Sequence, residues 1–120
     1  MSRMSRRVLD QRLNGKYLKE AEDLLVEKDY PQASEKLWGA AVEMVKAVAA
    51  SRGEPLGAHK SVGRFIVKLH REHPEWRLQE AYGLAETLHI NFYEDNLPEE
   101  LVEMRAEAVR GFIERLRGLL

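Results

Sequence analysis

The stretch from Tyr17 to Ala50 constrains the fold most, because it predicts two helices joined by a tight turn. The first helix is amphipathic, with apolar residues at helical spacing; these are Leu9, Leu13, Tyr17, Ala21, Leu24 and Leu25. In the turn, Asp29 predicts a helix N-cap, and Pro31 is tolerated in the first turn that follows. The second helix is more apolar, and its predicted buried stripe is Ala33, Leu37, Ala40, Ala41, Met44, Val45 and Val48. Two such helices bury each other's faces, so the segment predicts an antiparallel hairpin.

The rest of the chain continues the helical period and shows no strand pattern. We predict helices over residues 5–28, 30–50, 58–71, 75–92 and 97–119, with Gly15 as a possible break and Asn96 as the last N-cap. The expected inward-facing residues of the last three helices are Val62, Phe65, Ile66 and Leu69, then Ala81, Leu84, Ala85, Leu88 and Phe92, then Leu101, Ala108, Phe112, Leu116 and Leu119. The predicted fold class is therefore all-α, an antiparallel up-and-down bundle of four to five helices. It forms a single domain over 1–120, in which 1–15 is frayed or a separate helical segment.

The composition excludes several classes of protein. Apolar residues make up 44% and charged residues 32%, which is typical of a globular domain. The absence of cysteine excludes disulfides, thiolate nucleophiles and cysteine metal sites. No apolar run reaches the roughly 18 residues that span a bilayer, and no apolar segment follows the basic N-terminus, so we expect a cytoplasmic protein without a membrane partner. Few Asn and Gln beside many Arg and Glu indicate a thermophilic source.

Charge is spread unevenly along the chain. Residues 52–77 carry six Lys or Arg against three Glu, a net +3, whereas residues 78–104 carry seven acids and no Lys or Arg, a net −7. One face is then basic and another acidic, which permits a polyanion as partner. Ordinary solvated surfaces are the alternative interpretation.

Two groups of residues are candidates for binding. His59 and Lys60 lie at a predicted helix N-terminus, where backbone N–H groups favour anions, and Arg64 is one turn further on. The alternative there is a solvated first turn. The second group is a predicted polar pocket at the end of helix 75–92, and its members are His89, Asn91, Tyr93 and Glu94. The alternative is a half-buried histidine that compensates the helix dipole, with Tyr93 and Glu94 holding the loop to helix 30–50.

Other conspicuous side chains are predicted to have structural roles. His70 and His73 have a metal-like spacing, but Pro74 ends their helix and no third ligand follows, so we predict no metal site. Trp38 and Trp76 are expected in the core or at an interface. Glu43, inside an apolar helix, needs a partner if buried, either Lys46 or a histidine from the third or fourth helix.

Two segments resemble a known group of proteins. The hairpin pattern resembles the opening hairpin of HEPN-type domains, and it reads Tyr17-x3-Ala21-x2-Leu24-x4-Asp29-Tyr30-x2-Ala33-x3-Leu37-x2-Ala40-x2-Glu43-x2-Lys46-Ala47. The later run is similar to a motif of the archaeal PaREP family within that group, and it reads Leu88-His89-Ile90-Asn91-Phe92-Tyr93-Glu94. The resemblance implies a helical bundle associated with RNA cleavage, nucleotide binding or a nucleotidyltransferase partner.

The resemblance also bears on catalysis. Active HEPN-type proteins use an Arg and a following His with four to six residues between them, the Arg to bind phosphate and the His as acid or base. His89 matches that histidine, but Tyr82, Gly83 and Leu84 stand where the Arg is required. We therefore expect a non-catalytic HEPN-like module without a cofactor, which binds a nucleotide or RNA phosphate. It is expected to be a homodimer or the partner of a nucleotidyltransferase.

Two alternative functions stay open. The first is a metal-independent endoribonuclease that uses His89 with Arg64 or another distant Arg. The second is a tetratricopeptide-like adaptor for protein interactions, based on the small and aromatic residues of the hairpin. The expected homodimer rests on apolar residues that one helix face does not use, namely those of helix 30–50 and Leu116, Leu119 and Leu120.

Overall fold

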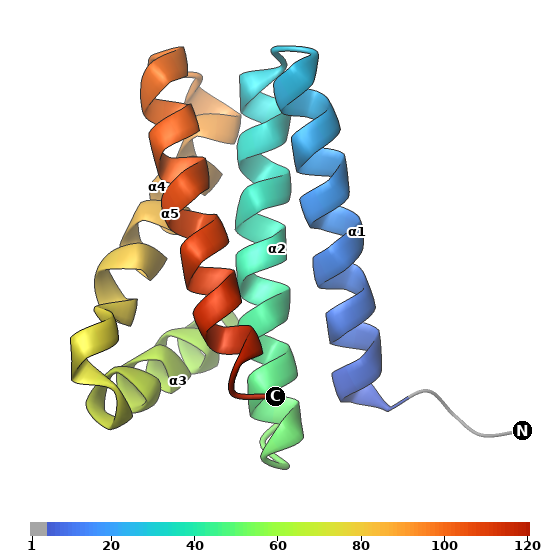
Figure 1. Ribbon diagram of the computed structural model, residues 1–120, viewed down its shortest axis with the longest axis vertical. Helices are drawn as coiled ribbons and strands as arrows, with labels where there is room; N and C mark the ends of the chain where they lie inside the picture. The colour runs from blue at the N-terminus through green and yellow to red at the C-terminus, as the bar shows by residue number, and fades with distance from the viewer. Residues whose placement is uncertain (1–4) are drawn as a thin grey trace, which may run out of the picture.

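Five α-helices and one short 3-10 turn make up the computed structural model, which describes residues 5–120 (Figure 1). In chain order they are α1 (Arg6–Val26), α2 (Tyr30–Ser51), α3 (His59–Glu72), η1 (Pro74–Trp76), α4 (Leu78–Glu94) and α5 (Glu99–Arg117). No strand occurs within these residues, so the all-α prediction is confirmed. None of the described helices is long and apolar enough to cross a membrane.

The α1–α2 hairpin forms where the sequence predicts it. Ser5 caps α1 by accepting a hydrogen bond at Oγ from the backbone N–H of Val8 (3.2 Å). The helix then runs without interruption through Gly15, so the predicted break there is wrong; residues 1–4 of the predicted 1–15 segment lie outside the described part. Asp29 accepts a hydrogen bond from the backbone N–H of Gln32 (3.3 Å), which confirms it as the N-cap of α2.

Helix α2 is the centre of the molecule. It packs along α1 and also against α4 and α5 (Figure 1). Twelve of its 22 residues are buried, including the whole predicted stripe. Close approach of α1 depends on Gly39, because a Cβ at this position would lie 3.1 Å from a ring carbon of Tyr17. The ring of Tyr17 on α1 therefore packs directly against the backbone of α2 at Gly39.

Helix α3 crosses the bundle and leads through η1 into α4 (Figure 1). All four predicted inward-facing residues of α3 are buried, because a strongly amphipathic helix has one face to bury. Helix α4 begins at Leu78 rather than at residue 75. The reason is that Pro74–Trp76 forms a separate turn and Arg77 takes a left-handed conformation with φ 54°, which interrupts the helix.

Helix α5 differs from the prediction at its start and in its register. Pro98, not Asn96, is its N-cap residue, and the Asn96 amide instead donates to Glu94 Oε2 (3.3 Å). Of the predicted inner residues, Phe112 and Leu116 are buried, but Leu101, Ala108 and Leu119 are only partly buried. The fully buried stripe that the prediction missed is Val102, Ala106, Val109 and Ile113.

Asn91 ties three elements together. It is fully buried on α4, and its Nδ2 donates to Ser34 Oγ on α2 (3.0 Å). Its Oδ1 accepts from the backbone N–H of Leu97 (2.9 Å), in the connection to α5. Asn91, rather than Tyr93 and Glu94, therefore holds this connection to α2.

The apolar residues on which the expected homodimer rests pack within the chain's own core. The apolar residues of α2 lie against its neighbours, Leu116 is fully buried, and Leu119 and Leu120 pack against the core. The exposed large apolar side chains of the described residues are Val8, Leu9, Val26, Val67, Ile90, Tyr93 and Met104.

We predict that Asn91→Ala lowers the free energy of unfolding by about 2 kcal/mol, because it leaves buried partners without their hydrogen bonds. Urea denaturation followed by circular dichroism measures the change. The matched control is Asn96→Ala in the adjacent exposed loop, which is expected to change stability by less than about 0.5 kcal/mol. Equal effects of the two substitutions would contradict the bridging role of Asn91.

Candidate functional site

His89 on α4 is held by two residues of α2. Its Nδ1 lies 3.0 Å and 3.1 Å from the two carboxylate oxygens of Glu35. A carboxylate only accepts hydrogen bonds, so Nδ1 carries the proton and Nε2 stays available to another group. The imidazole also stacks on Trp38, with ring centroids 5.3 Å apart and planes 27° from parallel. Glu35 and Trp38 thus fix both the tautomer and the orientation of His89.

His59, the first residue of α3, faces the same tryptophan. Its ring lies edge-on to Trp38 with centroids 6.1 Å apart, and 6.4 Å from the ring of His89. Two tyrosines of α4 complete the group: Tyr82 is 5.6 Å from Trp38, and Tyr93 meets His89 edge-on at 5.5 Å. Three helices therefore build one site, which we call the histidine–tryptophan cluster; its members are Glu35, Trp38, His59, Tyr82, His89 and Tyr93.

The cluster has a buried floor and an accessible rim. Trp38 is only 6% exposed, and burial, with a smaller effect of Glu86, raises the pKa of Tyr82. The side chain of His89 is 32% exposed and Tyr93 is 72% exposed. Solvent and ligands thus reach the imidazole of His89, while its position is set by packing from below.

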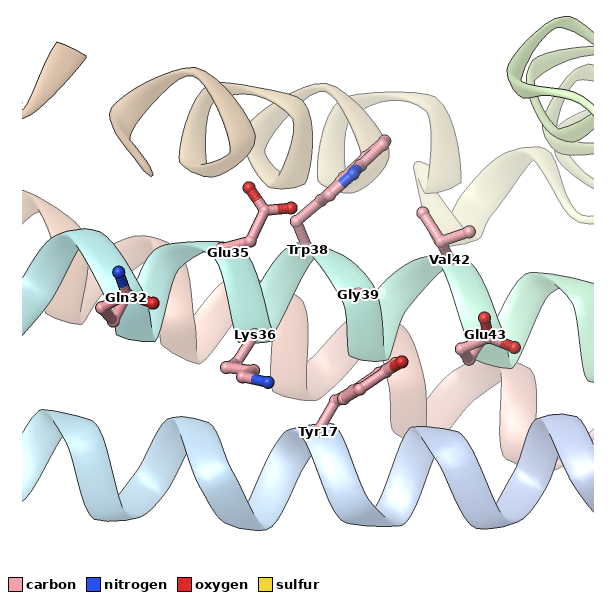
Figure 2. Close-up of a pocket in the computed structure, with 8 residues that line it drawn as sticks. All are labelled: Tyr17, Gln32, Glu35, Lys36, Trp38, Gly39, Val42 and Glu43. Atoms are coloured by element: carbon pink, nitrogen blue, oxygen red, sulfur yellow. The ribbon is translucent and has the colours of Figure 1, made fainter. Parts of the chain in front are cut away.

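A groove beside the cluster runs along the outer face of α2. Its cavity of about 360 Å³ is lined by residues that include Tyr17, Glu35, Trp38 and Glu43. Figure 2 shows that Glu35 and Trp38 extend from α2 toward α4, whereas Tyr17 and Lys36 lie between α1 and α2. Glu35 and Trp38 belong to both the groove and the cluster, so the two form one continuous surface.

Lys36 is neutralised within this groove. Its Nζ lies 2.6 Å from Glu20 Oε2 and 5.2 Å from the centre of the Tyr17 ring. The hydrogen bond from Lys36 also lowers the pKa of Glu20. The two imidazoles are accessible groups of the cluster to which a polar ligand can bind.

Comparison with protein families identifies the group to which this architecture belongs. The model of the archaeal PaREP1/PaREP8 family matches residues 11–113. The chain belongs to this family. The matched segment contains every residue of the histidine–tryptophan cluster. No curated protein and no solved structure matches the chain.

In this PaREP1/PaREP8 protein the other predicted binding residues are dispersed. Lys60 is exposed, and Arg64 lines a separate hollow of about 220 Å³ together with Glu54 and Lys68. Five residues separate Arg64 from His59, which places it about 140° away around the helix. The structure thus brings His59 to His89 and leaves Arg64 on another face.

At the end of α4 the predicted pocket is also divided. Tyr93 contacts His89, but Asn91 is buried in its bridging role. Glu94 is exposed and accepts a hydrogen bond from Asn96. The positions where active HEPN-type proteins need an Arg hold Tyr82, a cluster residue, and Leu84, which faces α5.

The sequence analysis missed Glu35 and the role of Trp38 beside the histidines. Their i, i+3 spacing places them on one face of α2, which is a usable signal. The sequence does not show which histidine faces them, because that depends on how α4 packs on α2. Within residues 5–120 no group of three or more His, Asp or Glu side chains is arranged to hold a metal ion; His73 instead stacks on Trp76.

Glu43 has an unexpected partner at the far end of the groove. Lys46 lies 3.8 Å away, as the sequence suggested, but the carboxyl of Asp10, which is 1% exposed, also neighbours Glu43. Burial, followed by the hydrogen bond with Asp10, raises the pKa of Glu43. Asp10 in turn pairs with Arg6, whose Nε lies 3.4 Å from Asp10 Oδ1. No histidine takes part in this pair.

We predict that this pair makes stability depend on pH. Because the pKa of Glu43 is higher in the folded state than the ordinary value of 4.5, the folded state binds the proton more tightly. The stabilisation is complete below the unfolded pKa and is lost as the pH rises through the folded pKa. Glu43→Gln removes this titration. The free energy of unfolding of the variant should therefore rise relative to that of wild type as the pH increases.

Urea denaturation across this pH range measures the difference. Glu27→Gln, at an exposed carboxyl beyond the end of α1, is the control and should leave the pH dependence unchanged. A constant difference between wild type and Glu43→Gln at all pH values would show that folding does not raise the pKa of Glu43.

Proposed function

We propose that this chain is a HEPN-like helical binding module that holds a nucleotide or RNA phosphate at the histidine–tryptophan cluster, without catalysing a reaction. The observation that carries the proposal is the pairing of His59 and His89, whose ring centroids are 6.4 Å apart on the face of Trp38. Two imidazoles at this separation can both donate to one phosphate group. The resemblance of the hairpin to the opening hairpin of HEPN-type domains supports the same function.

His89 is suited to bind an anion because Glu35 orients it. The carboxylate accepts the Nδ1 proton, which leaves Nε2 to donate to a phosphate oxygen when the ring is protonated. A donor with a fixed direction loses less conformational entropy on binding than a mobile lysine. His59 supplies the second donor from α3.

A nucleobase has a platform beside this phosphate position. Tyr93 is 72% exposed, and its ring meets His89 edge-on, so one face of the tyrosine is open to solvent. Bases of single-stranded RNA stack on such rings with little sequence preference, each stack contributing about 1–3 kcal/mol. We therefore favour a nucleotide or single-stranded RNA over a bare phosphate.

The charge distribution indicates how the ligand lies. His59 belongs to the segment 52–77 with net charge +3, whereas His89 and Tyr93 belong to the segment 78–104 with net charge −7. An RNA backbone is repelled from the second segment and attracted to the first. The phosphates then extend toward α3, and a single base reaches Tyr93.

The module is proposed to work as a homodimer or with a nucleotidyltransferase partner. A binding domain of this kind acts by presenting its ligand to another chain. We predict a dimer at micromolar concentration in sedimentation-velocity analysis, with Ile90 and Val67 among the exposed apolar residues available to an interface. A monomer at all concentrations would contradict the proposed homodimer. A complex with a nucleotidyltransferase would then be the remaining proposal.

One observation favours a second candidate, a metal-independent endoribonuclease. The Glu35–His89 pair resembles the carboxylate–histidine arrangement that orients a general base. In such a reaction His89 takes the proton from the RNA 2′-hydroxyl, whose oxygen attacks phosphorus. A protonated His59 gives a proton to the departing 5′-oxygen, while an Arg from elsewhere holds the phosphate, and a 2′,3′-cyclic phosphate and a free 5′-hydroxyl are the products.

We predict that the metal-free protein binds a fluorescently labelled, mixed-sequence single-stranded RNA at low salt. Binding should weaken as salt increases, because counterions are released from the phosphates. His89→Ala should weaken it by about tenfold, the effect of about 1.4 kcal/mol of lost charge-assisted hydrogen bonding. Fluorescence anisotropy gives the dissociation constants.

His73→Ala is the matched control, because it removes a histidine that stacks on Trp76 outside the cluster. If His89→Ala and His73→Ala weaken RNA binding equally, the RNA binds outside the histidine–tryptophan cluster. Gel analysis of the same RNA separates the two candidate functions: intact RNA agrees with a binding module, and cleavage by wild type but not by folded His89→Ala would establish the nuclease.

A further inference from the structure

A second hollow lies at the opposite side of α4 from the cluster, where the start of α4 meets the end of α5. Its volume is about 250 Å³. It is lined by residues of η1, the first two turns of α4 and the last three turns of α5. None of its lining residues belongs to the histidine–tryptophan cluster, and we call it the Trp76 hollow.

Small side chains create this space. Ala81 on α4 faces Ala108 and Gly111 on α5. A Cβ added at Gly111 would meet no other atom within 4 Å, so the space beside this glycine is open. The apolar surface open to a ligand comes from Ala81, Leu84 and Ala108, which are partly exposed. Leu78 and Phe112 support it from below, because Leu78 is fully buried and Phe112 is 2% exposed.

One wall of the hollow is an immobilised aromatic ring. Trp76 is stacked on one face by His73, with centroids 3.9 Å apart and planes 6° from parallel. The guanidinium of Arg115 lies 6.0 Å from the Trp76 ring centre. The indole is thereby held as a flat, partly exposed surface at the edge of an apolar floor.

The rim of the hollow carries excess positive charge. Arg115 forms no ion pair with any carboxylate of residues 5–120. Arg77 pairs with Glu80 at 2.9 Å, but both side chains are largely exposed, so this pair contributes little and can exchange partners. Two guanidinium groups and one carboxylate therefore surround an apolar depression.

We propose that the Trp76 hollow is a binding site for a small organic anion with a flat apolar body, of the aromatic carboxylate class. The body lies on the partly exposed Ala81, Leu84 and Ala108 beside Trp76, and the carboxylate pairs with Arg115, with Arg77 able to join it. An apolar floor with a few charged groups at its edge is the usual composition of a small-ligand site. This site is independent of the phosphate-binding function proposed above.

Isothermal titration calorimetry of the full chain with naphthoate tests the proposal. We expect one equivalent to bind, and the neutral analogue naphthylmethanol to bind at least about tenfold more weakly, because it cannot pair with Arg115. Arg115→Gln should weaken naphthoate by about tenfold and leave naphthylmethanol unchanged. Gly111→Leu should abolish both, because its side chain fills the hollow.

Matched controls separate the site from general effects. Arg117→Gln removes the same charge from the same helical turn outside the hollow, and Gly15→Leu adds the same side chain at an open glycine of α1. Both should bind naphthoate as wild type does. Absence of naphthoate binding, equal binding of the neutral analogue, or unchanged binding by Gly111→Leu would each overturn the proposal. If Gly111→Leu fails to fold by circular dichroism, the contrast between Arg115→Gln and Arg117→Gln decides it.

Discussion

The burial of α2 by α1, α4 and α5 is the constraint on which the rest of the structure depends. Its residues Ala33, Ala40, Ala41, Val45 and Val48 are completely buried, so three other helices must supply the surfaces that cover it. Burial of apolar surface stabilises by roughly 25 cal/mol per Å², and a helix covered on several sides gains more than one at the edge. The positions of α1, α4 and α5 thus follow from the need to cover one central helix.

Buried polar side chains then fix how these helices are aligned. Asn14 on α1 donates to the backbone carbonyl of Ala40 on α2 (2.7 Å), at a point where the two helices lie close. Asn91 performs the equivalent task between α2 and the start of α5. A buried amide without its partners is costly, so sliding a helix by one turn would be penalised at either site. The apolar core provides most of the stability, and the two asparagines select one alignment.

This alignment also explains why the cluster and the Trp76 hollow lie on different surfaces. On the face of α4 that packs against α2, Tyr82 and His89 contact Trp38, and His89 also contacts Glu35. These contacts give the cluster a buried floor. At the start of α4, the face toward α5 carries Leu78 and Ala81, and small residues of α5 leave space opposite them. One helix thus contributes to a histidine-rich surface at one place and to an apolar depression with arginines at another.

Sequence reasoning succeeded where the controlling interactions are local. The Asp29 cap and the buried face of α3 depend on residues within a few positions, and both are confirmed. It failed at Asn96, because the backbone N–H of Leu97 is taken by Asn91 and the Asn96 amide turns to Glu94. It also failed in the register of α5, where apolar residues occupy more than one face and the period alone does not choose between them.

What the sequence determined by itself is the helical character of the chain and the α1–α2 hairpin, because helical periodicity, the Asp29 cap and the Pro31 turn act over short distances. What only the tertiary structure decided is the candidate site. His59, Trp38 and His89 come from three helices, and periodicity states which residues share a face of one helix, not which faces meet. The packing around α2 made that choice, and it joined His89 to Glu35, a residue 54 positions away in the chain.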